Sequence, residues 1–211
     1  MLNRQFFFDH VRNTLFNGKL KQSQVEGLTY ILDVWERDHA KWDDRWLAYA
    51  LGTTHLETGA AMQPINEFGG NNYFEKNYGP TGNNPARAKK MGNTEPGDGA
   101  KYHGRGFVQL TWKNNYQKMS THLTSAFGKQ IDLVKNPALA LEPEYAAEIM
   151  FHGMNTGSFT GKKFADYFTK NGDGVPAKDN WVGARAIING NDKAALIAGY
   201  GKAYYAALSY M

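Results

Sequence analysis

Residues 41–59 read KWDDRWLAYALGTTHLETG, a stretch that predicts one buried helix with a defined start and end. Asp43 or Asp44 suits the N-cap position, and Gly59 suits the position just after the last turn. Apolar and small side chains recur between them at helical spacing, and the expected buried face consists of Trp46, Leu47, Ala50, Leu51 and Thr54. The helix ends in His55 and Glu57, so an acid lies where an apolar helix meets a glycine.

Helical periodicity continues on both sides of this stretch. Apolar side chains recur at helical spacing over residues 6–16, and a second apolar stripe runs through residues 25–35. Further helices are predicted near residues 113–127, 143–155 and 160–168. The segment that begins at residue 181 predicts one or two helices with a break near Asn189 and Gly190.

The central part of the chain, residues 60–106, loses this periodicity. It is crowded with Gly, Asn and Pro, as in NEFGGNNYFEKNYGPTGNNP and GNTEPGDGAKYHGRG. Loops of this length in compact domains are usually functional or disordered, and the aromatic residues here indicate order. The next residues, FVQLTW, predict a short β element. We therefore expect a mainly α (α+β) fold in one domain, residues 1–211: a helical part at about 1–59, an irregular segment at about 60–106 and a helical remainder at about 107–211.

Composition and charge restrict the possible functions. The chain has 211 residues, no cysteine and a formal net charge of +4, which suits an anionic polymer as partner. A disulfide framework and a thiolate metal site are excluded, and the six histidines show no ligand spacing. We expect no metal, no cofactor, no nucleic-acid partner and no stable membrane insertion, because no motif or long apolar run supports them.

Glu57 is the first candidate for chemistry. A half-buried carboxyl group at the end of an apolar helix can act as a general acid, whereas the simpler alternative is a helix-end acid in a surface ion pair. A glycosidase needs a second carboxylate, about 6.5–9.5 Å away in inverting enzymes and about 5–5.5 Å away in retaining ones. The candidates in the irregular segment are Glu67, Glu75, Glu95 and Asp98.

The stretch YHGRGFVQLTWKNNY, residues 102–116, carries the second group of candidates. Two glycines bracket Arg105, so the backbone can approach another group closely there. If residues 107–112 form a strand, alternation places Gln109 and Thr111 on one face. Amide and hydroxyl groups beside aromatic rings are suited to sugar hydroxyl and N-acetyl groups, although a solvent-facing strand edge gives the same pattern.

These stretches together resemble glycoside hydrolase family 19, the plant-type chitinase family, and are most similar to its bacteriophage endolysin branch. The matching segments are HLETG, YFEKNYG, GDGAKYHGRGFVQLTWKNNY and IING, in that order from about residue 45 to 205. The resemblance implies a lysozyme-like, two-lobed helical fold with a cleft between the lobes. It also implies inverting hydrolysis of a β-1,4 bond next to an N-acetylated sugar.

The resemblance also assigns roles to residues. Glu57 matches the general acid, and Glu75 matches the general base that activates water. Glu67 is the alternative base, because the spacing from Glu57 to Glu75 is shorter than in plant chitinases. Thr111 matches the residue that holds the water. Predicted sugar contacts are Gln109, Asn115 and Asn189, with His55 and Tyr102 flanking the cleft.

Besides the short spacing from Glu57 to Glu75, the chain departs from the family pattern in three ways. Leu56 separates His55 from Glu57, the arginine expected near IAGYGKAYY is absent, and so are the cysteines of the plant enzymes. The absence of cysteines and of a signal segment favours the endolysin branch.

The first functional hypothesis is an endolysin that acts on the glycan strands of peptidoglycan and causes host lysis. We expect it to act as a monomer without a separate wall-binding domain. It would wait in the host cytoplasm until another protein permeabilises the membrane. The alternatives are a chitinase, a non-catalytic glycan-binding domain and a lytic transglycosylase, which needs only one acid.

Overall fold

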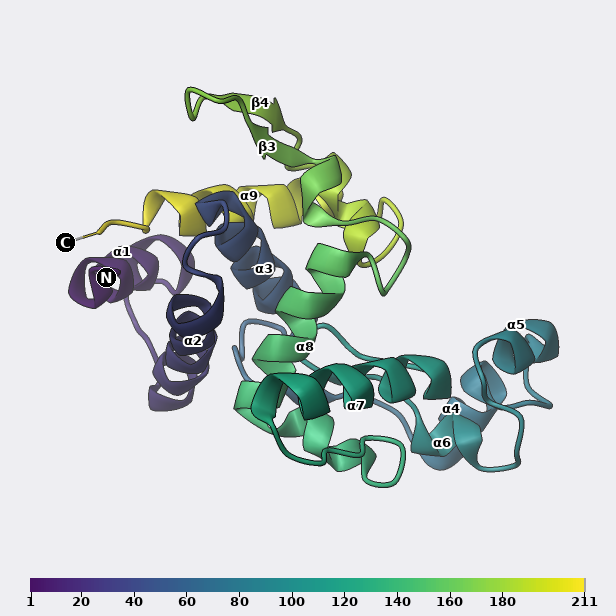
Figure 1. Ribbon diagram of the computed structural model, residues 1–211. Coiled ribbons are helices and arrows are strands. Elements are labelled where there is room, and N and C mark those ends of the chain that lie inside the picture. The colour runs from purple at the N-terminus through teal and green to yellow at the C-terminus, as the bar shows by residue number, and fades with distance from the viewer. Residues whose placement is uncertain (211) are drawn as a thin grey trace. The chain divides into compact units, whose positions relative to one another are not determined.

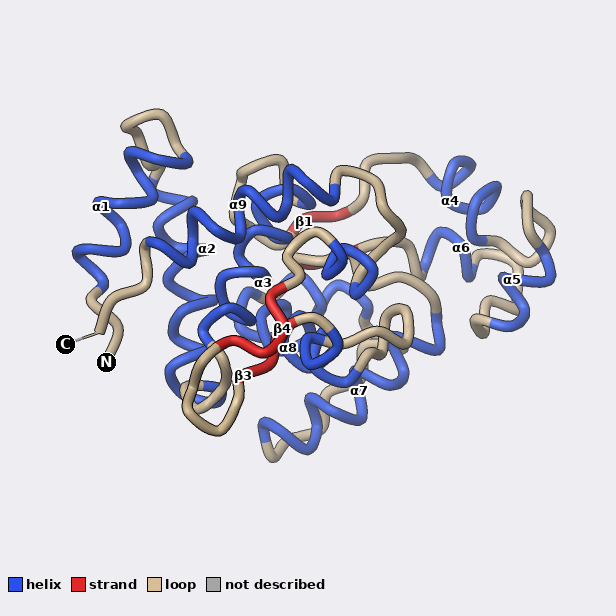
Figure 2. The backbone as a smooth tube through the Cα atoms, turned by 90° about the horizontal axis from the view of Figure 1, so that it is seen from above, coloured by secondary structure: helices blue, strands red, loops and turns tan. Residues whose placement is uncertain are grey.

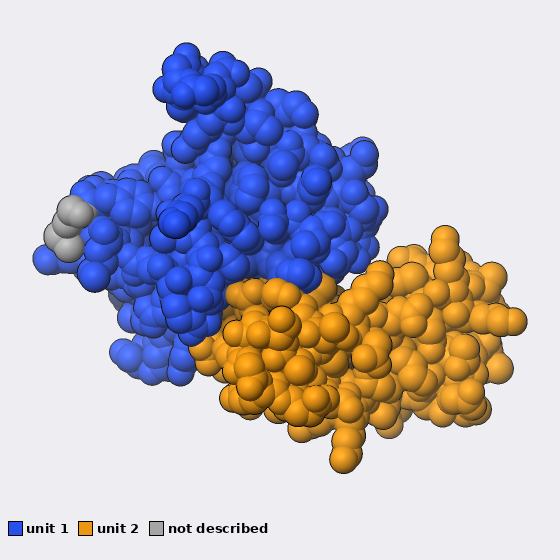
Figure 3. Space-filling view, viewed as in Figure 1, with its two compact units in different colours: residues 1–63, 150–211 blue, residues 64–149 orange. Residues whose placement is uncertain are grey.

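The structure, a computed structural model, describes residues 1–210 and is mainly helical (Figure 1). The chain divides into two compact units: unit 1 is residues 1–63 with 150–211, and unit 2 is residues 64–149 (Figure 3). The elements of unit 1 are α1 (Arg4–Leu15), α2 (Gln22–Val34), the π-helical turn η1 (Trp35–His39), α3 (Asp44–Glu57), η3 (Phe164–Asp166), β3 (Phe168–Lys170), β4 (Pro176–Asp179), η4 (Gly183–Ile187) and α9 (Ala194–Ala206).

Unit 2 carries the remaining elements. They are β1 (Ile65–Asn66), α4 (Asn71–Tyr78), α5 (Pro85–Lys90), α6 (Asp98–Lys101), β2 (Arg105–Gly106), α7 (Lys113–Phe127) and η2 (Pro137–Leu141). Helix α8 (Pro143–Thr156) begins in unit 2 and ends in unit 1. The predicted mainly α class with small β elements is therefore confirmed.

Helix α3 forms where the sequence predicts it. The Asp43 side chain accepts a hydrogen bond from the Arg45 amide at 3.1 Å and caps the helix, and Gly59 follows its end with a φ of +57°. Residues 47–55 are all buried, so the helix is enclosed on every side rather than on the single face that we expected. Trp46 is the exception among the predicted core residues, because its side chain is partly exposed.

The close approach of α3 to α9 explains this enclosure. A Cβ atom on Gly52 would lie 2.7 Å from the amide nitrogen of Gly201 and 3.2 Å from the carbonyl oxygen of Ile197. The two helices therefore touch backbone to backbone at this point. Because small residues let helix axes come closer than large ones do, Gly52 determines where α9 lies against α3.

The central segment is more regular than the sequence predicts. Instead of a continuous irregular stretch, residues 60–106 contain β1, α4, α5, α6 and β2. The three helices have 8, 6 and 4 residues, which is too short for a helical period to show in the sequence. The Asn84 side chain accepts a hydrogen bond from the Arg87 amide at 3.0 Å and caps α5.

Two other local predictions are wrong. The helix expected near residues 160–168 is replaced by η3 and β3. The FVQLTW stretch forms no strand, because Gln109 and Trp112 have φ angles of +57° and +79° and only Leu110 bridges to Arg105. The β element of this region is instead the short antiparallel pair of β1 and β2 (Figure 2). Gln109 and Thr111 therefore do not share the face of a strand.

The β3–β4 hairpin is attached to unit 1 by one buried cation. The Arg45 side chain is 1% exposed and donates hydrogen bonds to the carbonyl oxygens of Lys178 at 2.8 Å and Thr169 at 2.9 Å. It also pairs with Asp43 and Asp179. Burial disfavours the charged form of Asp43, but the hydrogen bonds and charge of Arg45 outweigh burial and lower the pKa of this carboxyl group. The hairpin base is thus fixed, while β4 itself is exposed.

Gly52→Ala should destabilise the protein by about 1–3 kcal/mol, because its methyl group would overlap the backbone of α9. Gly199→Ala in α9 is the matched control. A Cβ atom there meets nothing within 4 Å, so helix propensity alone should raise stability by about 0.5–1 kcal/mol. Urea unfolding followed by circular dichroism measures both. Equal stability of the two variants would contradict the backbone contact.

Candidate active site

The candidate residues are divided between the two units. His55, Glu57 and Asn189 lie in unit 1. The others lie in unit 2: Glu67, Glu75, Tyr102, Gln109, Thr111 and Asn115.

Glu57 is the last residue of α3 and is held by an arginine that the sequence analysis missed. Its Oε1 accepts a hydrogen bond from Arg185 Nη1 at 2.7 Å. The Arg185 side chain is only 4% exposed, and its Nε donates to the carbonyl oxygen of Asp192 at 3.0 Å. Within residues 1–210, Oε2 of Glu57 has no hydrogen-bond partner. One carboxylate oxygen is therefore fixed by Arg185, and among the described residues the other meets no donor.

Arg185 could have been found from the sequence. It is the one cation in WVGARAIING, an otherwise apolar stretch directly before the IING match. The family resemblance instead predicts an arginine further along the chain, in IAGYGKAYY, which contains none. The ion pair also agrees in part with the simpler alternative, in which Glu57 is a helix-end acid in a surface ion pair. It differs from that alternative because its partner, Arg185, is buried.

Asn189 follows η4 and is hydrogen-bonded to Arg185 through the backbone. Its backbone amide donates to the carbonyl oxygen of Arg185 at 3.0 Å, and its side-chain Oδ1 accepts from the Gly190 amide at 2.8 Å. The side chain is exposed. The turn after η4 thus links the backbone of Asn189 to that of Arg185, and the predicted sugar contact of Asn189 stays a prediction.

His55 and Tyr102 are buried. His55 is 5% exposed, with its Nδ1 3.0 Å from the Tyr204 hydroxyl and its ring centroid 4.3 Å from that of Tyr200. Burial lowers the pKa of His55 to about 4. Tyr102 is 1% exposed, and its hydroxyl donates to the carbonyl oxygen of Val134 at 3.2 Å. Their burial disfavours the predicted sugar contacts, and both side chains pack the interior of their units.

Glu67 lies just after β1, and one side-chain donor and one backbone donor hold its carboxylate. Its Oε1 accepts a hydrogen bond from the Tyr78 hydroxyl at 2.7 Å, and its Oε2 accepts from the Gly104 amide at 3.0 Å. A Cβ atom on Gly104 would lie 3.1 Å from this Oε2 and 2.8 Å from Gln109 Oε1. The carboxylate and the amide therefore converge over Gly104, which explains why the HGRG motif needs glycine as its second residue.

Gln109, Thr111 and Asn115 form a chain of contacts within the loop. Gln109 Nε2 donates to the carbonyl oxygens of Ile65 and Gly106, both at 3.2 Å. The Thr111 hydroxyl donates to the Gln109 carbonyl at 2.9 Å, and Asn115 Nδ2 donates to the Thr111 carbonyl at 2.8 Å. These bonds hold the loop in shape, so contacts of the three side chains with sugar or water stay predictions.

Glu75 has a different environment, made of backbone amides. Its Oε1 accepts from the Ala100 amide at 2.6 Å, and its Oε2 lies 3.4 Å from the Gly97 amide at the start of α6. A Cβ atom on Gly79 would lie 2.5 Å from the same Oε2. Asp98 is used in a similar way, because its Oδ2 accepts from the amides of Thr94 and Glu95. Both acids therefore order the loop that surrounds them.

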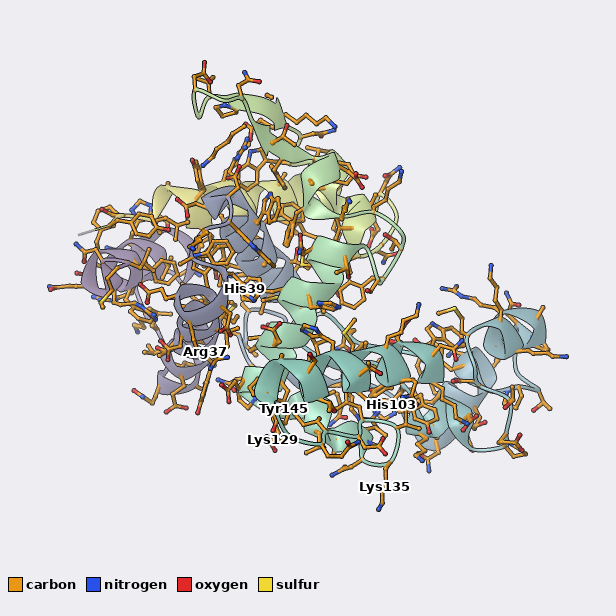
Figure 4. All side chains as sticks on the ribbon, in the orientation of Figure 1. Arg37, His39, His103, Lys129, Lys135 and Tyr145 are labelled. Atoms are coloured by element: carbon orange, nitrogen blue, oxygen red, sulfur yellow. The ribbon has the colours of Figure 1, made fainter. Side chains whose placement is uncertain are left out.

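Aromatic side chains near Glu67 are a further feature that the sequence analysis did not assign. Phe68 follows Glu67 directly and is 89% exposed, and Tyr73 is 49% exposed. His103, labelled in Figure 4, stacks on Phe74 with ring centroids 4.1 Å apart, and its Nε2 lies 3.3 Å from Asn66 Oδ1. Burial is the main cause of the lowered pKa of His103. An exposed phenyl ring beside a carboxylate offers a surface on which a sugar ring can stack.

Comparison with known proteins identifies the family. A profile of class I chitinases, glycoside hydrolase family 19, matches residues 37–153, more than half of the 211 residues. The chain therefore belongs to glycoside hydrolase family 19. One similar solved structure is a crystal structure of a chitinase C mutant, which is 22% identical with a TM-score of 0.45. The alignment covers 74% of this chain and 66% of that one, just under two thirds of its length. No curated protein matches the chain.

Two kinds of feature are absent from the part of the chain that the structure describes. Residues 1–210 contain no group of three or more His, Asp or Glu side chains placed to hold a metal ion. In the same residues, no helix is long and apolar enough to cross a membrane.

Acid should destabilise the protein partly through His55. Its pKa is about 4 when folded and about 6.5 when unfolded, so between these values the unfolded chain binds more protons. The free energy of unfolding should therefore fall as pH drops from about 6.5 to 4, by up to about 1.4 kcal/mol per pH unit from this group. His55→Gln should flatten the dependence in urea-unfolding series. The same slope in both proteins would contradict this role for His55.

Proposed function

We propose that the protein is a glycoside hydrolase that cleaves β-1,4 bonds by inverting general acid and base catalysis, with Glu57 as the acid. The observation that supports this proposal is the carboxylate at the end of α3: buried Arg185 holds one oxygen, and the other has no partner within residues 1–210. A fixed carboxyl group with one available oxygen is what proton delivery to a leaving oxygen requires. Family membership supports the reaction class.

We infer that Glu67, our alternative base, is favoured over Glu75 by the surroundings of the two carboxylates. Both oxygens of Glu75 face backbone amides that position α6, so turning this side chain toward a water would release that loop. Glu67 shares the space over Gly104 with the Gln109 amide and is followed by the exposed Phe68. A base needs an orienting partner and access to a sugar-bound water, and Glu67 has both features.

The proposed substrate is the glycan strand of bacterial peptidoglycan, which would make the protein an endolysin released from the host cytoplasm by a separate membrane-permeabilising protein. The net charge of +4 supports an anionic polymer over neutral chitin. Chitin is the second candidate, supported by the description of the family as class I chitinases.

The substrate is tested by incubating the purified protein with Gram-negative peptidoglycan and with chitin and analysing the products by mass spectrometry. Hydrolysed muropeptides with ordinary reducing ends are expected. If only chitin yields products, the substrate is chitin and not peptidoglycan. Muropeptides with 1,6-anhydro ends would indicate a lytic transglycosylase. NMR of a soluble oligosaccharide should show the α anomer first, because inverting hydrolysis of a β bond gives that anomer.

Glu57→Gln should lower the rate of hydrolysis by about 10²–10⁴-fold, because the amide keeps the shape of the side chain but carries no transferable proton. The matched control is Glu26→Gln, which changes an exposed glutamate of α2 in the same unit and should leave the rate unchanged. Circular dichroism confirms folding of both. More than about a tenth of wild-type activity in folded Glu57→Gln protein would overturn the assignment of the acid.

Substitution of the two other glutamates should identify the base. Glu67→Gln should abolish hydrolysis in protein that stays folded, and it should lower the free energy of unfolding by about 1–3 kcal/mol, because the Tyr78 hydroxyl and the Gly104 amide lose a charged acceptor. Glu75→Gln should lower stability by a similar amount, about 1–3 kcal/mol, because the amides of Ala100 and Gly97 lose a charged acceptor, and it should retain activity in the folded fraction. Activity assays and urea unfolding on both variants provide the comparison. An active Glu67→Gln with an inactive, stably folded Glu75→Gln would restore Glu75 as the base.

A further inference from the structure

A small pocket lies at the start of α3, at the opposite end of the helix from Glu57. From Trp46 to Glu57 the helix rises about 16 Å, at about 1.5 Å per residue. The pocket has a volume of about 310 Å³, the low end for ligand pockets. The residues that line it include Lys41, Trp42, Asp43, Trp46, Thr169 and Lys170. We call this pocket the tryptophan pocket.

Two tryptophans give the pocket its shape. Their ring centroids lie 5.4 Å apart at an interplanar angle of 63°, so the two rings form a corner. Trp42 stacks on His39, labelled in Figure 4, and Trp46 stacks on Phe164. Both tryptophans are nevertheless partly exposed, whereas neighbouring Trp35 is only 1% exposed. A corner of partly exposed indole rings is suited to the flat C–H face of a sugar ring.

The charges around this corner are positive. Lys41 is exposed, and Lys170 is 43% exposed with its Nζ 3.9 Å from Asp43 Oδ1. Asp43 offsets them only in part, because its carboxylate accepts hydrogen bonds from the Arg45 guanidinium through both oxygens and also pairs with Lys170. Lys41, Lys170 and Asp43 together leave one positive charge at the pocket, which can attract a negative group, and Thr169 lines the pocket beside them.

We propose that the tryptophan pocket is a secondary binding site for an anionic, N-acetylated glycan strand, separate from the site of hydrolysis. The indole rings stack on a sugar ring, and Lys41 and Lys170 pair with the carboxylates that the strand carries. This inference rests on the proposed peptidoglycan substrate, because chitin has no carboxylate for the lysines. Binding at both ends of α3 would hold a long strand while its bonds are cut.

The test measures binding of the full chain to purified peptidoglycan sacculi and to insoluble chitin by co-sedimentation. Glu57→Gln serves as the background so that the polymer stays intact. Lys41→Ala/Lys170→Ala should weaken binding to sacculi about tenfold, and Trp42→Phe should weaken it severalfold while preserving the aromatic packing. The control Lys118→Ala/Lys202→Ala removes the same charge from two exposed lysines outside the pocket and should change little.

Salt and NMR provide independent readouts. Binding to sacculi should decrease as sodium chloride is added, and it should decrease less in the Lys41→Ala/Lys170→Ala protein. The indole N–H signals of Trp42 and Trp46 should shift on addition of a soluble muropeptide more than on addition of a chitin oligosaccharide. Unchanged signals, or equal losses of binding in the pocket and control variants, would overturn the proposal.

Hydrolysis of a short soluble oligosaccharide separates this proposal from the proposed function. For this test the pocket variants are made in protein that retains Glu57. They should hydrolyse the oligosaccharide at the wild-type rate, because a short substrate cannot reach both ends of α3. Loss of this activity in the pocket variants would contradict a separate binding site. If wild-type protein hydrolyses neither polymer but the pocket variants still lose binding to sacculi, the proposed function fails and the binding site stands.

Discussion

The backbone contact between α3 and α9 is the constraint on which unit 1 depends. Because Gly52 lets the two helices touch, α3 is enclosed along residues 47–55, and both of its ends are fixed in space. Its start carries Asp43, which binds the Arg45 side chain, and its end carries Glu57, which binds Arg185. A rigid buried helix is thus a support that fixes the polar groups at its two ends.

The two candidate carboxylates of the reaction are held by different means. Glu57 is oriented by a buried cation, whereas Glu67 is oriented by a phenol hydroxyl and a backbone amide. The first arrangement fixes one oxygen strongly and leaves the other unpartnered. The second gives each oxygen one neutral donor. Environments that differ in this way allow two chemically identical groups to take different roles.

Parts of this structure could be predicted from the sequence because local rules determine them. The capped start of α3, the glycine after its end and the helices at 113–127 and 143–156 follow from periodicity and capping. The short helices of residues 71–101 could not be predicted, because four to eight residues do not show a helical period. The left-handed backbone at Gln109 and Trp112 also opposes the β propensity of FVQLTW, and tertiary contacts determine it.

The same limit applies to the candidate site. Glu57 and Glu67 are recognisable in the sequence, but Arg185 lies 128 positions from Glu57 and only the fold brings them together. Burial of His55 and Tyr102 likewise depends on packing against residues far along the chain. A motif therefore names the residues of a site, while the distinction between a ligand contact and a core residue requires the structure.

The β3–β4 hairpin has a consequence for protein engineering. Its base is fixed by Arg45, whereas its tip, residues 171–175, is exposed, and a Cβ atom on Gly172 or Gly174 would meet nothing within 4 Å. Exposed tips of this kind are the places where chains accept insertions. A peptide or a small domain inserted there would be carried by the enzyme without entering the core, so the hairpin is a natural attachment point for a module that directs it to a chosen surface.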